Sequence, residues 1–154
     1  MKTIRTFLTM AICATVLSCD DTLKTDTCPI KEGTFILNNG KWGDNNSNIG
    51  IYSPMEKGFC ADVFLTANGR MLGDLGQDMI IFDDCLYIAV NGSQTIFVTD
   101  MLLKIKHQIN AEKDGTRLSP RSFSATDDKV YVTYYEGYLG EISSDSSLRL
   151  CPVG

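Results

Sequence analysis

The sequence has few of the side chains on which enzymes and nucleic-acid binders depend. Its 154 residues include one histidine, His107, and one tryptophan, Trp42. No H-E-x-x-H, G-x-S-x-G or phosphate-binding glycine loop occurs, so the common metal, serine-nucleophile and nucleotide motifs are missing. The 14 basic residues are outnumbered by 19 acidic ones and form no basic stripe, whereas a binder of nucleic-acid phosphates needs a basic face. We therefore expect a protein that is not an enzyme, holds no cofactor and binds no nucleic acid.

Apolar runs of transmembrane length are missing after residue 18. The first 18 residues have the parts of a secretory signal, because Lys2 and Arg5 precede the uncharged stretch Phe7–Leu17. This segment ends in Val16-Leu17-Ser18-Cys19, which resembles the bacterial lipobox, where the cysteine thiol is acylated. We predict a signal peptide over residues 1–18 and a stable membrane anchor on Cys19. A chance cysteine or a buried thiol is the alternative.

Asp20 and Asp21 follow the predicted anchor directly. An acidic pair at this place resembles the surface-export signal of Bacteroidetes lipoproteins. The resemblance implies a lipid-anchored protein of the outer membrane that faces the cell exterior, and retention facing the periplasm is the alternative. The polar stretch Leu23–Lys31 is typical of a tether. The predicted organisation is a signal peptide (1–18), a lipidated N-terminus and tether (19–32) and a folded part (33–154).

The folded part has a β-type pattern throughout. Short runs rich in Val, Ile, Phe and Tyr are separated by clusters of Asn, Gly, Asp and Ser. A weak helical period around Met101–His107 is outweighed by the evenly spaced strands beside it. The predicted strands are Thr34–Leu37, Ile49–Tyr52, Cys60–Leu65, Met79–Phe82, Leu86–Val90, Thr95–Thr99, Leu103–Ile109, Phe123–Thr126, Val130–Tyr134 and Tyr138–Ser143.

Part of the sequence repeats with an offset of 44 residues. DDCLYIAV (Asp83–Val90) matches DDKVYVTY (Asp127–Tyr134), and the same offset places TIFVTD, from Thr95, on LGEISS, from Leu139. GTFILNNG, from Gly33, is similar to LYIAVNG. A unit of this length with four short strands is typical of a β-propeller blade. We predict an all-β fold of four-stranded antiparallel sheets, with the Asp pairs and Asn-Gly in its turns. A β-sandwich is the alternative.

The chain holds about three blades, whereas propellers have about 4–8. A stack of sheets that ends open leaves unpaired edges and a half-exposed core. We therefore expect a partial propeller, which is the N-terminal portion of a longer protein, a truncated protein or a unit that assembles with its own copies.

Three segments carry a resemblance to a known family: FILNNGKWGDNNSNIGIYSP, DVFLTANGRMLGDLGQDMIIFDDCLYIAVNGSQTIFVTD and PRSFSATDDKVYVTYYEGYLGEIS. They resemble the YncE-like propellers of Bacteroidetes surface lipoproteins, a domain of unknown function called DUF5074, most specifically over Ala67–Met79. The resemblance implies seven or eight blades. Some members are encoded beside TonB-dependent transporters, and one subgroup captures cobalamin. It therefore implies a ligand-capture or interaction module, with a TonB-dependent outer-membrane transporter as partner and a corrinoid as candidate ligand.

The loops at one end of such sheets would hold the ligand contacts. In a propeller, the loop between the second and third strands and the segment leading into the first strand emerge on one face. Trp42 lies in a polar loop of this kind, where a large aromatic side chain can stack on a flat ligand; a plug over the first blade is the alternative. Hydrogen-bonding side chains expected on the same face are Gln77, Asn91, Arg121 and Tyr135. Asn91 has a turn role as its alternative, since Asn-Gly turns need a positive φ.

Other polar residues are expected to be structural. Arg70 is predicted to pair with Asp74 and to hold the segment before the next strand. His107 falls on a predicted outer strand and is expected at the surface. The carboxylate pairs Asp83-Asp84 and Asp127-Asp128 occupy equivalent turns, which favours turn chemistry over calcium binding.

Four cysteines follow Cys19, at positions 28, 60, 85 and 151. An even number in an envelope protein allows two disulfides, and the spacings fit no zinc pattern. Cys60 and Cys85 fall in predicted strands, where a cysteine is also a small buried apolar group. The sequence leaves the pairing open.

Two other classes of function remain possible from the sequence. A propeller enzyme of the lactonase or quinoprotein type needs several convergent carboxylates or histidines on the axis face, and few are visible. A structural or adhesive surface protein needs no small ligand at all.

Overall fold

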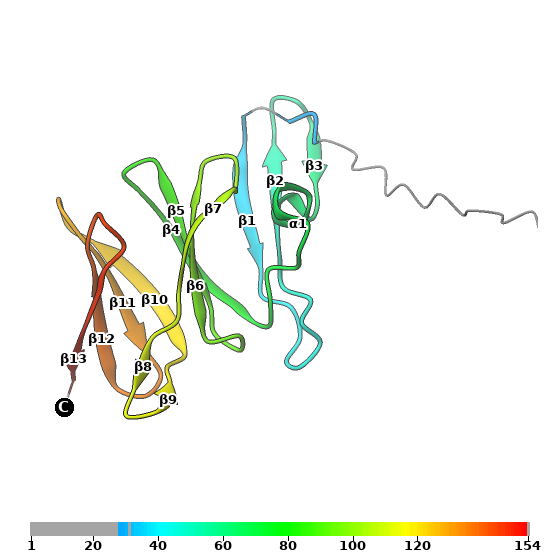
Figure 1. Cartoon of the computed structure of the whole chain (residues 1–154). Helices are drawn as coiled ribbons and strands as arrows, with labels where there is room; N and C mark the ends of the chain where they lie inside the picture. The colour runs from blue at the N-terminus through cyan, green and yellow to red at the C-terminus, as the bar shows by residue number, and fades with distance from the viewer. Residues whose placement is uncertain (1–27, 31, 154) are drawn as a thin grey trace, which may run out of the picture.

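The computed structural model describes residues 28–30 and 32–153. The predicted signal peptide, Cys19 and most of the tether lie outside the described residues. Within them, three antiparallel sheets follow one another along the chain and stand face to face (Figure 1). The prediction of an all-β fold with four-stranded antiparallel sheets is confirmed. The described residues contain no helix that could span a membrane.

Sheet 1 has three strands in the order β1-β2-β3, and sheets 2 and 3 have four each, in the orders β4-β5-β6-β7 and β10-β11-β12-β13. A separate hairpin of β8 and β9 lies between sheets 2 and 3 in the sequence. The elements are β1 (Thr34–Asn38), β2 (Asn48–Ser53), β3 (Gly58–Cys60), α1 (Val63–Asn68), β4 (Gly76–Phe82), β5 (Cys85–Val90), β6 (Thr95–Asp100), β7 (Ile105–Ile109), β8 (Glu112–Lys113), β9 (Thr116–Arg117), β10 (Pro120–Ala125), β11 (Val130–Tyr134), β12 (Tyr138–Ile142) and β13 (Leu148–Pro152).

Sheet 2 is buried on both faces. Its central strands β5 and β6 are buried along almost their whole length, as expected for strands covered on both sides. Ile88 and Phe97 belong to a cluster shared with sheet 1 and α1, which we call the first core. Tyr87 and Val98 belong to a cluster shared with sheet 3, the second core. Sheet 2 therefore forms the common wall of two cores.

Sheet 3 has one buried and one exposed face. Along β11, Val130, Val132 and Tyr134 are buried in the second core, while the residues between them are more exposed. On the exposed face, the Glu141 carboxylate accepts from Lys129 at 2.7 Å and from Arg149 at 3.0 Å. This alternation is typical of a sheet with one face in water.

The ion cluster on sheet 3 makes stability depend on pH. The Lys129 ammonium, followed by the Arg149 guanidinium, holds the pKa of the Glu141 carboxyl below its ordinary value. A lowered folded pKa stabilises the fold above the unfolded pKa, and this contribution is lost as the pH falls through the folded value. Glu141→Gln should therefore melt below the wild type near neutral pH, and the gap should close in acid. Thermal unfolding followed by circular dichroism across this range measures the gap.

Glu112→Gln is the matched control, because Glu112 is exposed on β8 and forms no ion pair within the described residues. Its melting temperature should follow that of the wild type at every pH. A gap for Glu141→Gln that is the same in acid as at neutral pH would contradict the prediction.

The repeat is confirmed in its strands, but its second half is shifted by one residue. β5 and β11 correspond with the predicted offset of 44, since Val90 and Tyr134 both end their strands. Val90 pairs with Thr95 and Tyr134 pairs with Tyr138, so Thr95 corresponds to Tyr138 and not to Leu139. The turn after β11 is one residue shorter than the turn after β5. A shift of one residue between β6 and β12 places each side chain on the opposite face of the strand from the one that the repeat alignment predicts. Sequence similarity alone does not reveal this shift.

The strand predicted at Cys60–Leu65 is wrong. β3 ends at Cys60, and α1 covers Val63–Asn68. Residues in the left-handed region flank the helix, with φ of 53° at Asp62 and 66° at Gly69. Phe64 of α1 is buried against Phe97, with the ring centroids 5.3 Å apart. Tertiary packing of Phe64 thus overrides the β propensity of this apolar run.

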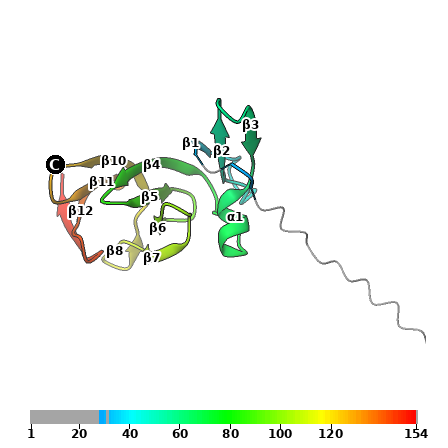
Figure 2. The same cartoon turned by 90° about the horizontal axis from the view of Figure 1, so that it is seen from above.

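Sheet 1 corresponds to the last three strands of the other sheets. The β1–β2 and β5–β6 connections lie at the same end of the molecule (Figure 1), so β1 corresponds to β5. This agrees with the similarity of GTFILNNG to LYIAVNG. β4 and β10, the first strands of sheets 2 and 3, contact each other and lie along the same side of the molecule in the view from above (Figure 2). Among the described residues, sheet 1 has no counterpart of β4 and β10, and β1 pairs with β2 alone.

The predicted turn chemistry is confirmed at Asp83-Asp84. Both residues have positive φ, 49° and 54°, and they join β4 to β5 as a two-residue hairpin loop of the I′ kind. Asp127 and Asp128 lie in the equivalent connection between β10 and β11. Strand β13 and the β8–β9 hairpin are missing from the predicted set. Strands β8 and β9 have two polar residues each, and β13 (LRLCP) contains an arginine and ends in a proline.

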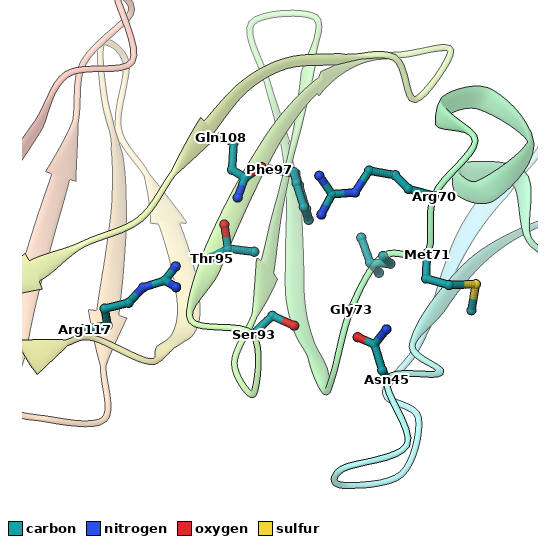
Figure 3. Close-up of a pocket in the computed structure, with 10 residues that line it drawn as sticks. Asn45, Arg70, Met71, Gly73, Ser93, Thr95, Phe97, Gln108 and Arg117 are labelled. Carbon is teal, nitrogen blue, oxygen red and sulfur yellow. The ribbon is translucent and has the colours of Figure 1, made fainter.

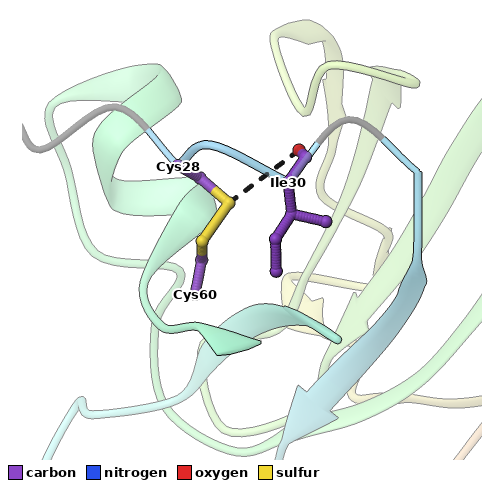
Figure 4. The surroundings of a disulfide bond; sticks show 3 residues. All are labelled: Cys28, Ile30 and Cys60. Carbon is purple, nitrogen blue, oxygen red and sulfur yellow. Dashed lines mark hydrogen bonds between the residues drawn. A yellow bond between two sulfur atoms is a disulfide. The ribbon is translucent and has the colours of Figure 1, made fainter. Parts of the chain in front are cut away.

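One disulfide joins Cys28 to Cys60, with a Cα–Cα distance of 5.8 Å and a separation of 32 residues (Figure 4). Ile30 lies beside the bond (Figure 4). The bond ties the chain ahead of β1 to the end of β3. Cys85 and Cys151 are free and partly buried, so one of the two disulfides that the count allows is formed.

Candidate functional site

The predicted ligand-contacting loops lie at one end of the sheets, here called the loop end (lower end in Figure 1). Each loop is hydrogen-bonded to the segment at or before the first strand of sheet 2 or sheet 3. The Asn91 N–H donates to the Leu75 carbonyl at 2.8 Å, the Tyr135 N–H donates to the Ser119 carbonyl at 2.9 Å, and the Gly76 N–H donates to the Asn39 carbonyl at 3.1 Å. The backbone therefore holds these loops in fixed positions.

The Trp42 side chain is exposed to solvent at the loop end. It is 70% exposed, so the alternative of an apolar plug over sheet 1 is wrong. The loop around it is well anchored. The Lys41 N–H donates to the Asn46 side-chain oxygen at 2.8 Å, and the Gly43 N–H donates to the Asp74 carboxylate at 3.1 Å. An exposed indole on an anchored loop offers a stacking surface at little entropic cost.

Asn91 connects sheets 2 and 3. Its side-chain N–H donates to the Pro120 carbonyl at 3.0 Å, at the start of β10. In the turn that follows β5, the residue with a positive φ is Gln94, at 52°. The alternative role of Asn91 as the positive-φ residue of this turn is therefore wrong.

Gln77 is exposed on β4, beside a register shift between Gly76 and Asp78.

Arg121 and Tyr135 come together at the loop end of sheet 3. The Arg121 guanidinium lies 5.8 Å from the centre of the Tyr135 ring, a cation–π geometry. Tyr135 is 73% exposed. The neighbouring Tyr134 is buried, and burial raises the pKa of its phenol well above the ordinary value. Tyr135 is therefore free for a ligand, whereas Tyr134 serves the second core.

The five predicted residues thus lie at one end of the molecule but on three different sheets. They offer two exposed aromatic rings, one cation and neutral amides, which suit stacking and hydrogen bonding. The nearby carboxylates serve the fold: Asp74 binds the Trp42 loop, and Asp78 accepts from the Phe123 N–H at 2.7 Å. In the part of the chain that the structure describes, no three His, Cys, Asp or Glu side chains gather as a metal site.

The predicted pairing of Arg70 with Asp74 is wrong. The Arg70 guanidinium lies over the Phe97 ring, 5.3 Å from its centre, and Asp74 accepts from Gly43 instead. His107 is exposed on β7, the outermost strand of sheet 2, as expected.

Sequence reasoning passed over Asn45, Gln108 and Arg117, which line a pocket together with Arg70. These residues come from separate segments that only the tertiary fold brings together. The local sequence does not indicate that these residues form a pocket. The one hint is that two of the pocket residues, Arg70 and Arg117, are basic in a chain with a net negative charge.

Comparisons with known proteins add little. No family model and no curated protein matches the sequence. Among solved structures, the computationally designed protein Ika4 is similar over 81% of this chain, with 12% identity and a TM-score of 0.38. The chain spans 63% of the length of that protein. A likeness of this degree indicates neither fold family nor function.

Proposed function

We propose that the protein is a ligand-capture or interaction module that a lipid on Cys19 anchors to the outer membrane, facing the cell exterior. The observation that carries the binding part is the loop end, where Trp42 and Tyr135 expose aromatic rings on hydrogen-bonded loops. The anchor and its membrane are inferred from the lipobox-like sequence.

The sheets are, in this proposal, blades of a YncE-like propeller of the DUF5074 kind. Sheets 2 and 3 would be complete blades, with β4 and β10 nearest the axis. Sheet 1 would lack its innermost strand. Support comes from the shared strand order and from the near-identical strand offsets of sheets 2 and 3. A corrinoid is the candidate ligand and a TonB-dependent transporter the candidate partner, both from the family resemblance.

Titration with cyanocobalamin tests this function. Trp42 is the single tryptophan and lies within the loop end, so its fluorescence reports on binding there. We expect saturable quenching, corrected for corrinoid absorption, together with saturable heat in calorimetry. Tyr135→Ala should weaken binding by about tenfold, roughly what one lost stacking contact of 1.4 kcal/mol gives.

The matched control is Tyr52→Ala, which removes another exposed ring, on sheet 1 and outside the loop end. Its affinity should equal that of the wild type. Absence of saturable heat in the folded wild type would reject the corrinoid, and equal affinity in Tyr135→Ala would reject the loop end as the binding surface.

A further inference from the structure

A second concave surface lies away from the five predicted residues. It is a pocket of about 370 Å³ over β6 and β7, on the face of sheet 2 that carries Phe97 (Figure 3). The segment that links α1 to β4 closes one side, and Arg117 of β9 closes the other. The polar side chains that line it are Asn45, Arg70, Ser93, Thr95, Gln108 and Arg117.

The charge of this pocket is opposite to that of the chain. The protein carries a formal charge of -5, yet the residues that line the pocket include two arginines and no carboxylate. Within the described residues, neither Arg70 nor Arg117 forms an ion pair. An anion in the pocket would be attracted by both guanidinium groups.

Both guanidinium groups are held in place by contacts that leave donors free. The Arg70 guanidinium carbon lies over the Phe97 ring, 5.3 Å from its centre. Arg117 donates to the Gln94 carbonyl at 3.1 Å, and Gln94 donates back to the Arg117 carbonyl at 3.2 Å. Each guanidinium has five N–H donors, so most of them remain available. Figure 3 shows the two side chains pointing into the pocket from opposite sides.

Gly73 and Ser93 lie close together in the lining of the pocket. Gly73 has φ of 138°, and a Cβ at this position would lie 2.5 Å from the Ser93 hydroxyl oxygen. That hydroxyl accepts from the Asp74 N–H at 2.8 Å, which leaves its own proton free to donate. Ser93 thus adds a neutral donor between the arginines.

We infer that this pocket binds an oxyanion group, a carboxylate or a phosphate, through the guanidinium groups of Arg70 and Arg117. Planar guanidinium groups bind such anions with two parallel hydrogen bonds. The ligand would be a small anionic molecule, because the pocket is small and open. The pocket shares no residue with the five predicted residues of the loop end, so anion binding here is independent of the proposed function.

The test follows the arginine side chains directly. In protein with ¹⁵N-labelled arginine, the Nε–Hε signals are recorded while inorganic phosphate, and separately acetate, is added at constant ionic strength. The signals of Arg70 and Arg117 should move along one saturable curve. Arg121 and Arg149, which lie over Tyr135 and beside Glu141, provide internal controls and should not move.

Arg117→Gln should weaken binding by about tenfold, as expected for losing a charged hydrogen-bonding partner. It leaves Phe97 and Arg70 in place, so it preserves the fold even if Arg70→Gln does not. Linear shifts without saturation, or equal shifts at Arg121, would overturn the inference. Saturation by phosphate and not by acetate would narrow the ligand to phosphorylated compounds.

Discussion

Phe97→Ala is expected to lower the free energy of unfolding by about 3–5 kcal/mol, the range for removing a fully buried phenylalanine. The Phe97 side chain is 0% exposed. It lies on the central strand β6, its ring packs against the Phe64 ring, and the Arg70 guanidinium lies over it. Its removal would leave a cavity between sheet 2 and α1. Urea unfolding followed by circular dichroism gives the free energy.

Phe59→Ala is the control for this substitution, because the Phe59 side chain is 53% exposed on sheet 1. Its loss should be well below that of Phe97→Ala. Since domains are stable by about 5–15 kcal/mol, the loss of about 3–5 kcal/mol in Phe97→Ala would remove a large share of the stability. A loss of less than about 1 kcal/mol, the effect of an ordinary substitution, would mean that Phe97 is not central to the first core.

Cys60→Ser is expected to destabilise the protein by about 3–4 kcal/mol, from the loop-closure entropy of a bond that spans roughly 32 residues. The Cys28–Cys60 bond ties the chain before β1 to the end of β3. The effect should be greatest in sheet 1, which has three strands rather than four. Thermal unfolding with and without reductant measures it.

Cys85→Ser provides the comparison, because Cys85 is a free thiol at the start of β5. It should melt close to the wild type in oxidising buffer and should respond to reductant as the wild type does. Cys60→Ser, in contrast, should not respond to reductant. Equal melting of Cys60→Ser and the wild type in oxidising buffer would falsify the stabilising role of the bond.

Most strands could be predicted because their side chains determine them locally. β5 and the central residues Ile96–Val98 of β6 are apolar on both faces, whereas β11 alternates, and each pattern matches the burial in the structure. The exceptions have non-local causes. α1 forms because Phe64 packs on Phe97, thirty-three positions away in the sequence. The one-residue slip between β6 and β12 arises from a turn length that strand similarity does not reveal.

The candidate site was predictable to a similar degree. Antiparallel topology alone places Trp42, Asn91 and Tyr135 in loops at the same end. The topology does not predict how exposed each side chain is or what it binds. The Trp42 side chain is exposed to solvent, whereas the Asn91 amide donates a hydrogen bond to the Pro120 carbonyl. The partners of Arg117 could not be found from the sequence, because the residues that line its pocket come from separate segments that only the tertiary fold brings together.

The double burial of sheet 2 has a consequence for how the protein opens. Strands β5 and β6 contribute side chains to both cores, so neither core can be hydrated without disturbing the strands that hold the other. Their amides therefore exchange with solvent deuterium only when the whole structure opens, while the edge strands β3 and β13 exchange by local fraying. The molecule behaves as one cooperative unit centred on sheet 2, with its least protected parts at the two outer edges.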